Sequence, residues 1–320
     1  MFIGVKDMII IIDYLTIKQN NISVLDTLEF LQIKTEYRDK FIKYCANMST
    51  YEYSYRYDNI SINYKDTDTG NRVSVNMSGQ GCRTFTDISH INLLTLLKHA
   101  VNDSWTCSRI DLACDEKEKI LNIKQLLKIS QDFVNDKKQQ VRSKLQYCDP
   151  RNTTKGITIY YGSPKSNILI RIYDKARERR YENNILHWIR CEIQIRDTNA
   201  NQTMILLSEN QTNSGLVFSG ILNNYLQFLK KNTDKQNADL LPQWKKFIQN
   251  TNKVKIYTDK GRQYNADYIR HNICKMYSTT LYTYSQLKDS NGKNSLNNII
   301  LSAKTKLNQK QKNLIAQQKK

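Results

Sequence analysis

The chain has 320 residues, and 39% of them are hydrophobic, so it can bury a substantial core and is not a disordered polypeptide. It carries 49 Lys and Arg against 30 Asp and Glu, a formal charge of +19. Such an excess favours a polyanionic partner, nucleic acid ahead of a membrane surface, over a basic surface that is only solvated. No stretch approaches the ~20 apolar residues of a membrane span, and the apolar run Met8–Ile12 is too short for a signal peptide. A cytoplasmic protein is therefore expected.

The sequence lacks the motifs that are typical of several classes of protein. The seven cysteines are scattered without a C-x-x-C pair, which favours free thiols over disulfides or a zinc site. The four histidines form neither H-x-H nor H-E-x-x-H, which argues against histidine-pair nickases and zinc hydrolases. The absence of G-x-x-x-x-G-K-[ST] argues against an ATP-driven helicase.

The first hundred residues alternate strand and helix patterns. The β-branched run Met8–Ile17 predicts the first core strand, and Val24–Cys45 has helical spacing. Tyr51–Tyr57 alternates tyrosine with polar residues, which predicts a strand with a tyrosine face. That face either packs on the core or stacks on bases. The two glycines in Met77–Phe85 predict a loop with positive φ and close backbone approach, a weak signal for phosphate binding.

A second strand is predicted over Thr106–Asp115. It places the odd-numbered residues, including Asp111 and Asp115, on one face, with Ile110 and Leu112 in the core. Two carboxylates on one strand face are costly unless they are paired or bind a cation. A divalent metal site is one interpretation, with Asp111 the stronger candidate, while Asp115 could equally open the following loop.

The stretch Asn167–Ile195 concentrates the most reactive residues. An apolar strand ends on Arg171 and Tyr173, and a charged segment follows. Asp174 is a candidate cap for a helix over Lys175–Asn184, whose N-terminal amides would attract phosphate beside the phenol. Neighbouring cations or a metal would favour the phenolate form of the tyrosine, which is otherwise a poor nucleophile at neutral pH.

A further strand closes this stretch. Its even-numbered residues are polar and face one way, whereas its odd-numbered residues are apolar and face the core. The polar set is Arg190, Glu192, Gln194 and Arg196. Glu192 and Asp111 could together bind Mg²⁺ or Mn²⁺, which prefer oxygen ligands. Alternatively, Glu192 pairs with Arg171 or Arg190.

The amino-acid composition changes over the last seventy residues. Residues 251–320 hold 14 Lys and Arg against 3 Asp and Glu and are rich in Asn and Gln. A catalytic domain over residues 1–250 and a basic DNA-binding region over residues 251–320, with a flexible tail, are therefore predicted. The charge favours contact with a phosphate backbone, although such a run also suits a solvated helix.

Four blocks in this order resemble the replication initiation factor (Rep_trans) family. They are M-S-G-Q-G-C-R-T-F (77–85), S-R-I-D-L-A-C-D (108–115), I-T-I-Y-Y-G-S-P-K-S-N-I-L-I-R-I-Y-D-K (157–175) and W-I-R-C-E-I-Q-I-R (188–196). Its members are rolling-circle initiators of small Gram-positive plasmids and related relaxases of conjugative elements. The resemblance implies an α+β fold in which mostly antiparallel sheets with flanking helices form duplicated strand-helix-strand halves, with a helical basic C-terminal region.

The resemblance also implies a chemistry. It is that of a sequence-specific, metal-dependent DNA nickase and ligase whose tyrosine forms a 5′-phosphotyrosine and leaves a 3′-OH primer. Tyr173 matches the nucleophile, with Arg171 and Lys175 beside it in the same block. Tyr181 is the second candidate, and Tyr160 and Tyr161 are the third. The acidic positions that would hold Mg²⁺ or Mn²⁺ are Asp111, Glu192 and Asp115.

The expected partners are double-stranded origin DNA and single-stranded DNA, a second copy of the chain in a homodimer, and, as an open option, a host helicase. Three alternatives stay open: a relaxase of an integrative conjugative element, a non-catalytic DNA-binding regulator, and a basic RNA-binding protein. The basic residues predicted to contact DNA are Arg83, Arg109, Arg190, Arg196, Lys165, Arg262, Arg270 and Lys275.

Overall fold

The structure is a computed structural model, and its contacts divide the chain into two units, Met1–Ile256 and Tyr257–Lys320. In the part of the chain that the structure describes, no helix is both long and apolar enough to cross a membrane. The described residues are 8–46, 50–67, 70–135, 140–154, 156–180, 185–231, 237–256, 270, 273–274, 278–286, 301–304, 307 and 315. In the second unit these include helix α11 (Ser278–Gln286).

The first unit contains two runs of elements. The first run is β1 (Ile10–Asn20), α1 (Val24–Phe30), α2 (Thr35–Arg38), β2 (Ile42–Cys45), β3 (Tyr53–Tyr57), β4 (Ile60–Thr67), β5 (Gly70–Met77), α3 (Gly79–Ile88) and α4 (Leu93–Asn102). The second run is β6 (Thr106–Glu116), α5 (Ile123–Val134), β7 (Val141–Ser143), β8 (Cys148–Thr153), β9 (Gly156–Tyr161), β10 (Ile168–Asp174), α6 (Lys175–Glu178), β11 (Ile189–Arg196), α7 (Asp197–Glu209), α8 (Ser214–Tyr225), β12 (Leu226–Phe228) and α9 (Pro242–Phe247).

Ten strands form one antiparallel sheet in the order β2-β3-β4-β5-β1-β6-β11-β10-β9-β8. The first strands of the two runs, β1 and β6, pair with each other near the centre of the sheet. In the first run β5 pairs with β1, and in the second run β11 pairs with β6. The order of elements in the second run therefore repeats that of the first, which matches the predicted duplicated halves. A small sheet of β7 and β12 lies apart from the large one.

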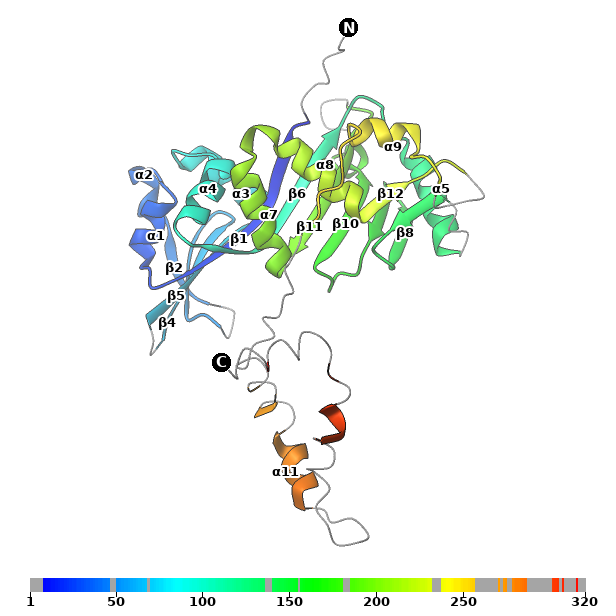
Figure 1. Cartoon of the computed structure of the whole chain (residues 1–320). Helices are drawn as coiled ribbons and strands as arrows, with labels where there is room; N and C mark the ends of the chain where they lie inside the picture. Colours follow the sequence, from blue (N-terminus) through cyan, green and yellow to red (C-terminus); the bar gives the residue numbers. More distant parts are fainter. Residues whose placement is uncertain are drawn as a thin grey trace. The chain divides into compact units, whose positions relative to one another are not determined.

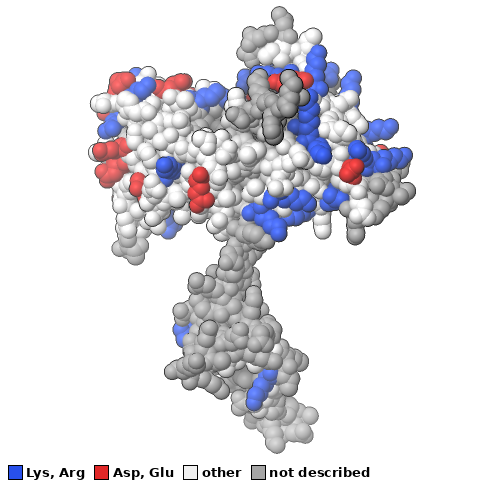
Figure 2. All heavy atoms as spheres, turned by 45° about the horizontal axis from the view of Figure 1, so that its top comes forward, with Lys and Arg blue, Asp and Glu red and all other residues white. Residues whose placement is uncertain are grey.

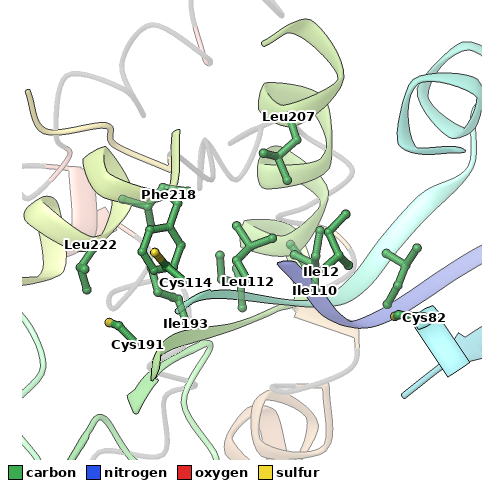
Figure 3. Close-up of a cluster of buried hydrophobic side chains, with 14 of the residues drawn as sticks. Ile12, Cys82, Ile110, Leu112, Cys114, Cys191, Ile193, Leu207, Phe218 and Leu222 are labelled. Carbon is green, nitrogen blue, oxygen red and sulfur yellow. The ribbon is translucent and has the colours of Figure 1, made fainter. Parts of the chain in front are cut away.

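The two faces of the large sheet differ in chemistry. Ile110, Leu112 and Cys114 of β6 point to the face on which Leu207 of α7 and Phe218 of α8 lie (Figure 3). All five are buried, as the alternation predicts. Figure 1 shows α4, α7 and α8 lying together across this face. The opposite face carries the odd-numbered residues of β6 and is polar.

The predicted helix over Val24–Cys45 is wrong in extent. Helix α1 ends at Phe30, Gln32 takes a left-handed conformation at φ 51°, and the chain then forms α2 and the edge strand β2. Ile33 is fully buried and bridges to Ser89, so tertiary packing overrides the helical spacing.

The predicted loop over Met77–Phe85 is also wrong, because residues from Gly79 onward form helix α3. Gly79 and Gly81 do not have positive φ. Close backbone approach explains both instead: a Cβ on Gly81 would lie 2.2 Å from the carbonyl oxygen of Asn59, and a Cβ on Gly79 would lie 2.7 Å from Oδ1 of Asp13. The first turn of α3 thus packs directly against Asp13 and Asn59.

The tyrosines of β3 support the packing interpretation over base stacking. Tyr55 and Tyr57 are half-buried and pack against the core. The ring of Tyr57 lies against Phe41, with centroids 5.7 Å apart. Because Tyr55 pairs with the fully buried Ile62, the tyrosine face is the helix-bearing face of the sheet.

Candidate functional site

The candidate site lies on the open polar face of the second half of the sheet. Antiparallel pairing sets Arg171 opposite Glu192 and Gln194 opposite Asp111. These residues come from β10, β11 and β6, which are adjacent strands. Strand alternation in three neighbouring strands therefore brings together side chains that are up to 83 positions apart in the sequence.

Both central carboxylates are buried and held by arginines. Nε and Nη2 of Arg109 donate to the two oxygens of Asp111 at 3.0 and 2.6 Å. Nη2 of Arg171 donates to both oxygens of Glu192, at 2.8 and 2.7 Å. Burial raises the pKa of Asp111 above its usual value; Arg109 opposes this shift, whereas the nearby charge of Glu192 adds to it. The two carboxylates thus lie close enough to repel each other.

Asp115 belongs to a different group on the same face. Nε and Nη2 of Arg190 donate to its two oxygens at 2.6 and 2.7 Å, and Arg190 is opposite it in the register. Burial raises the pKa of Asp115, but the bonds from Arg190 outweigh this and hold it below its usual value. Asp115 therefore pairs with Arg190 and does not form a carboxylate pair with Asp111, which corrects the grouping of all three acids.

A small pocket of about 100 Å³ opens beside the central carboxylates. It is lined by Arg109, Tyr160, Leu169, Arg171, Glu192 and Gln194. The Oε1 of Gln194 accepts a hydrogen bond from Arg109, while its Nε2 is buried without a hydrogen-bond partner. An unpaired donor between two arginines fits an anionic oxygen, such as that of a phosphate.

Tyr173 lies next to this pocket, one row along the face. It pairs with Arg190 in the register, and its side chain is 6% exposed. The guanidinium carbon of Arg171 lies 4.8 Å from its ring centroid, and Nζ of Lys175 lies 5.4 Å from it. Burial, and then the charge of Glu192, raise the pKa of Tyr173 above its ordinary value, while Arg171 and Arg190 oppose the rise. The resting side chain is thus a protonated phenol among cations.

The predicted helix over Lys175–Asn184 is wrong in extent. Asp174 does cap a helix, since its side chain accepts from the backbone N–H of Arg177, but α6 ends at Glu178. A helix of one turn supplies little dipole, so the expected attraction of phosphate to its end loses its basis. Lys175 is buried and paired with Glu178, which leaves side-chain charge as the main local source of attraction.

The remaining predicted residues fall in several places. Arg196 lies opposite Arg109 at the end of β11, next to the pocket. Arg83 lies on α3, with Nη1 3.7 Å from Oδ1 of Asp13. Lys165 is exposed in the turn before β10. Arg270 is exposed in the second unit. Tyr181, Arg262 and Lys275 lie outside the described residues.

The two tyrosines of β9 separate clearly. Tyr160 lines the pocket, whereas Tyr161 is fully buried on the opposite face, where its hydroxyl lies 2.9 Å from that of Ser130. Burial raises the pKa of Tyr161 well above its ordinary value. Tyr161 is therefore a core residue, and Tyr160 is the only one of this pair within reach of the site.

Two side chains of β1 that were not among the predicted site residues join the site. Asp13 contacts Arg190 as well as Arg83, with 3.5 Å between its Oδ2 and Nη1 of Arg190. The ring of Tyr14 lies 3.8 Å from the guanidinium carbon of Arg109. Only the pairing of β1 with β6 places them here, although the polar residue inside an apolar strand run was a signal for Asp13.

The carboxylate oxygens of the site are ligands of the kind that a divalent cation prefers. Asp111 and Glu192 are adjacent carboxylates in a buried, polar setting, and a cation would relieve the repulsion between them. Among the described residues, no three His, Cys, Asp or Glu side chains gather as a metal-ligand cluster. Of the described residues, these two carboxylates would hold the metal, and water or phosphate could complete its coordination.

Charge is unevenly divided between the halves of the sheet. Residues 8–104 hold 10 Lys and Arg against 11 Asp and Glu, whereas residues 105–250 hold 24 against 15. Figure 2 shows the acidic side chains gathered over the end that bears α1 and the basic ones over the end that bears α5. The half that contains the candidate site is thus the one that attracts a polyanion.

The family model described as "Replication initiation factor" matches residues 106–300. The chain belongs to the replication initiation factor family. A second model, "Rolling Circle replication initiation protein N-terminal domain", matches residues 9–98. This second match ends within α4, and the first begins at β6, where the second half of the sheet begins.

Individual relatives agree with this family. The chain is 25% identical over 266 residues to a protein of Bacillus subtilis (strain 168) named "Putative DNA relaxase NicK", covering 78% of this chain and 74% of that protein. The fold matches the solved structure of a rolling circle replication initiator protein from Geobacillus stearothermophilus, with a TM-score of 0.66 and 23% identity, covering 78% of this chain and 98% of the other. The predicted α+β fold and the rolling-circle initiator family are confirmed.

Proposed function

We propose that this member of the replication initiation factor family nicks and rejoins one strand of an origin DNA through a covalent bond to Tyr173. The observation that carries the proposal is the position of this phenol. The buried phenol lies between Arg171 and Lys175 on the polar face of the sheet, beside the pocket that Gln194 helps to line. Tyr160 lines the pocket itself and has Arg151 5.1 Å from its ring centroid, whereas Tyr173 has two cations beside its ring, Arg171 and Lys175.

The reaction is a transesterification at phosphorus. The phenol oxygen of Tyr173 forms a bond to phosphorus as the bond from phosphorus to the 3′ oxygen breaks, and the phenol loses its proton while the 3′ oxygen gains one. The product is a 5′-phosphotyrosine and a free 3′-OH, which can prime synthesis. Because one phosphodiester replaces another, little free energy is lost and the 3′-OH can attack in return to rejoin the strand.

The cations of the site suit this chemistry. Arg171 and Arg109 line the pocket and can bind the non-bridging oxygens, which stabilises the charge that develops in the transition state. Asp111 and Glu192 would hold a divalent cation, which would supply Lewis-acid polarisation of the phosphodiester. Arg190 opposes the rise in the pKa of Tyr173 and so favours the phenolate.

The experiment uses supercoiled plasmid that carries the cognate origin, with Mg²⁺ or Mn²⁺ and, in a parallel reaction, with EDTA. Wild type is expected to give open circles bearing covalently bound protein, and Tyr173→Phe is expected to bind the origin without nicking it. Nicking that persists in EDTA would remove the metal from the proposal. A phosphotyrosyl peptide mapped from the covalent complex identifies the nucleophile directly.

Matched variants separate the candidate tyrosines. Tyr160→Phe and Tyr181→Phe remove the same hydroxyl and are expected to retain nicking. Equal nicking by Tyr173→Phe and wild type would refute the assignment. Absence of nicking by wild type on the correct origin would favour a DNA-binding regulator. Activity as a DNA relaxase, the function in the name of the Bacillus subtilis relative, would use the same nicking and rejoining chemistry. Homodimer formation and a helicase partner stay predictions.

A further inference from the structure

The open face of the first half of the sheet forms a polar surface that continues into the candidate site. A row of paired residues crosses the strands from the free edge at β2 to β6. The row reads Ile42, Arg56, Ser61, Asn76, Thr16 and Arg109. Its last member lines the pocket, so the row leads to the proposed reaction centre without a break in the sheet.

A second row runs parallel to the first. It reads Tyr44, Ser54, Asn63, Ser74, Lys18 and Thr106. Hydrogen bonds within the face confirm that neighbouring rows share it: Nε of Arg56 donates to Oγ of Ser54 at 2.9 Å, and Oγ of Ser74 donates to Oδ1 of Asn76 at 3.3 Å. The two rows and their cations are here called the polar track.

The charge of the polar track differs from that of the half that contains it. That half as a whole holds slightly more acidic than basic residues, yet the two rows contain no Asp or Glu among their described residues. At the border of the track, Lys65 and Arg72 face each other, and Glu52 pairs with Lys65 at 4.0 Å. The charged members of the two rows are therefore all basic: Lys18, Arg56 and Arg109.

The composition of the track indicates contact with a phosphate backbone. Hydroxyl and amide groups with Lys and Arg are the usual partners of phosphate oxygens. Lys18, Arg56, Ser61 and Asn76 are partly exposed and can make such contacts, whereas the smaller polar side chains between them are buried. Of the two rows, only Tyr44 is aromatic, which is too little for a base-stacking platform. The amide Nδ2 of the buried Asn63 has no hydrogen-bond partner and is thus an unsatisfied donor within the track.

The dimensions favour a single strand. At ~4.8 Å between strands, the track extends about 24 Å from β2 to β6, and its rows are about 7 Å apart. We propose that the polar track binds the single-stranded DNA that adjoins the phosphodiester attacked in the candidate site, in a sequence-independent way. This inference rests on the proposed function for the position of the DNA, but the binding itself is testable without nicking.

The test measures binding of the full-length protein to a fluorescent dT₂₅ oligonucleotide, which carries no origin, by anisotropy over a series of salt concentrations. The double variant Lys18→Gln/Arg56→Gln is expected to lower the slope of log K against log salt by about 1.4, since each phosphate contact on a single strand contributes about 0.7. The control Lys98→Gln/Lys124→Gln removes the same charge from exposed positions of α4 and α5 on the helix-bearing face and is expected to leave the slope unchanged.

A second pair of variants guards against misfolding. Asn76→Asp places one carboxylate on the track with little change of shape and is expected to weaken binding, whereas Asn102→Asp at the exposed end of α4 is expected to have no effect. Thermal melting checks that all variants fold. Equal effects of the track and control variants, or none from either, would overturn the proposal, and so would an effect on duplex but not on single-stranded DNA. Failure of wild type to nick its origin would refute the proposed function and leave this binding result unaffected.

Discussion

Two opposing effects set the reactivity of Tyr173: burial disfavours its phenolate form, and the neighbouring cations favour that form. The side chain is almost fully buried, so the protein removes the water that would stabilise a phenolate. Arg171, Arg190 and Lys175 surround it, and the negative charge of Glu192 opposes them. The phenol thus needs either a more alkaline solution or a change in the charge around Glu192, such as substrate and metal binding would bring.

The pH dependence of nicking follows from this balance. Because the pKa of Tyr173 lies above its ordinary value, only a small fraction is phenolate at neutral pH, and that fraction grows about tenfold for each pH unit. Single-turnover nicking rates are expected to rise by about this factor per unit between pH 7 and pH 9. A rate that levels off below pH 8 would show that the free phenol does not limit the step.

At the scale of elements, the end of β6 is tied to the strand that follows α6. Both oxygens of the buried Glu116 accept backbone hydrogen bonds from the loop, which come from Glu118, Ile120 and Leu121, and Nε2 of His187 lies 2.9 Å from its Oε2. Burial raises the pKa of Glu116, but these bonds outweigh it and hold it below its usual value. The carboxylate therefore fixes the loop between β6 and α5 and the entry to β11.

Glu116→Gln tests this anchor. At pH 7 the variant is expected to lose about 2 kcal/mol of unfolding free energy, because a buried hydrogen-bond network loses its charge. A carboxyl whose folded pKa is lowered contributes stability above its unfolded pKa and loses it as pH falls through the folded value. The difference from wild type is thus expected to shrink below about pH 4.3 in urea titrations. Glu209→Gln, the same change at an exposed end of α7, is the control.

At the scale of the molecule, the charge rises along the chain. The first half of the sheet is close to neutral, the second half is basic, and residues 251–320 are the most basic for their length. Each unit therefore contributes separately to the attraction of a polyanion. The basic residues of the second unit lie outside the part of the sequence that forms the candidate site.

A chain that ends at Ile256 tests this division. It contains the complete sheet and every described residue of the site, so it is expected to fold and to nick a short single-stranded origin oligonucleotide. Its affinity for duplex origin is expected to fall and to depend less steeply on salt, because 12 basic residues are removed. Unchanged duplex binding in filter or anisotropy assays would contradict a DNA-binding role for residues 257–320.

The sequence by itself determined the strands that carry the site. Alternation in β6 and β11 separates polar from apolar side chains, so the face of Asp111 and that of Glu192 could be predicted, as could the cap at Asp174. Periodicity is a local property that survives in a single strand, which is why these predictions needed no knowledge of neighbours.

Only the tertiary structure decided how these strands combine. Pairing of β1 with β6 brought Asp13 and Tyr14 to the site, and the register assigned one arginine to each carboxylate. The glycines of α3 and the early end of α1 likewise depended on contacts with distant segments. Strand order and close packing are set by surfaces that meet only after folding, so no pattern within one segment could have revealed them.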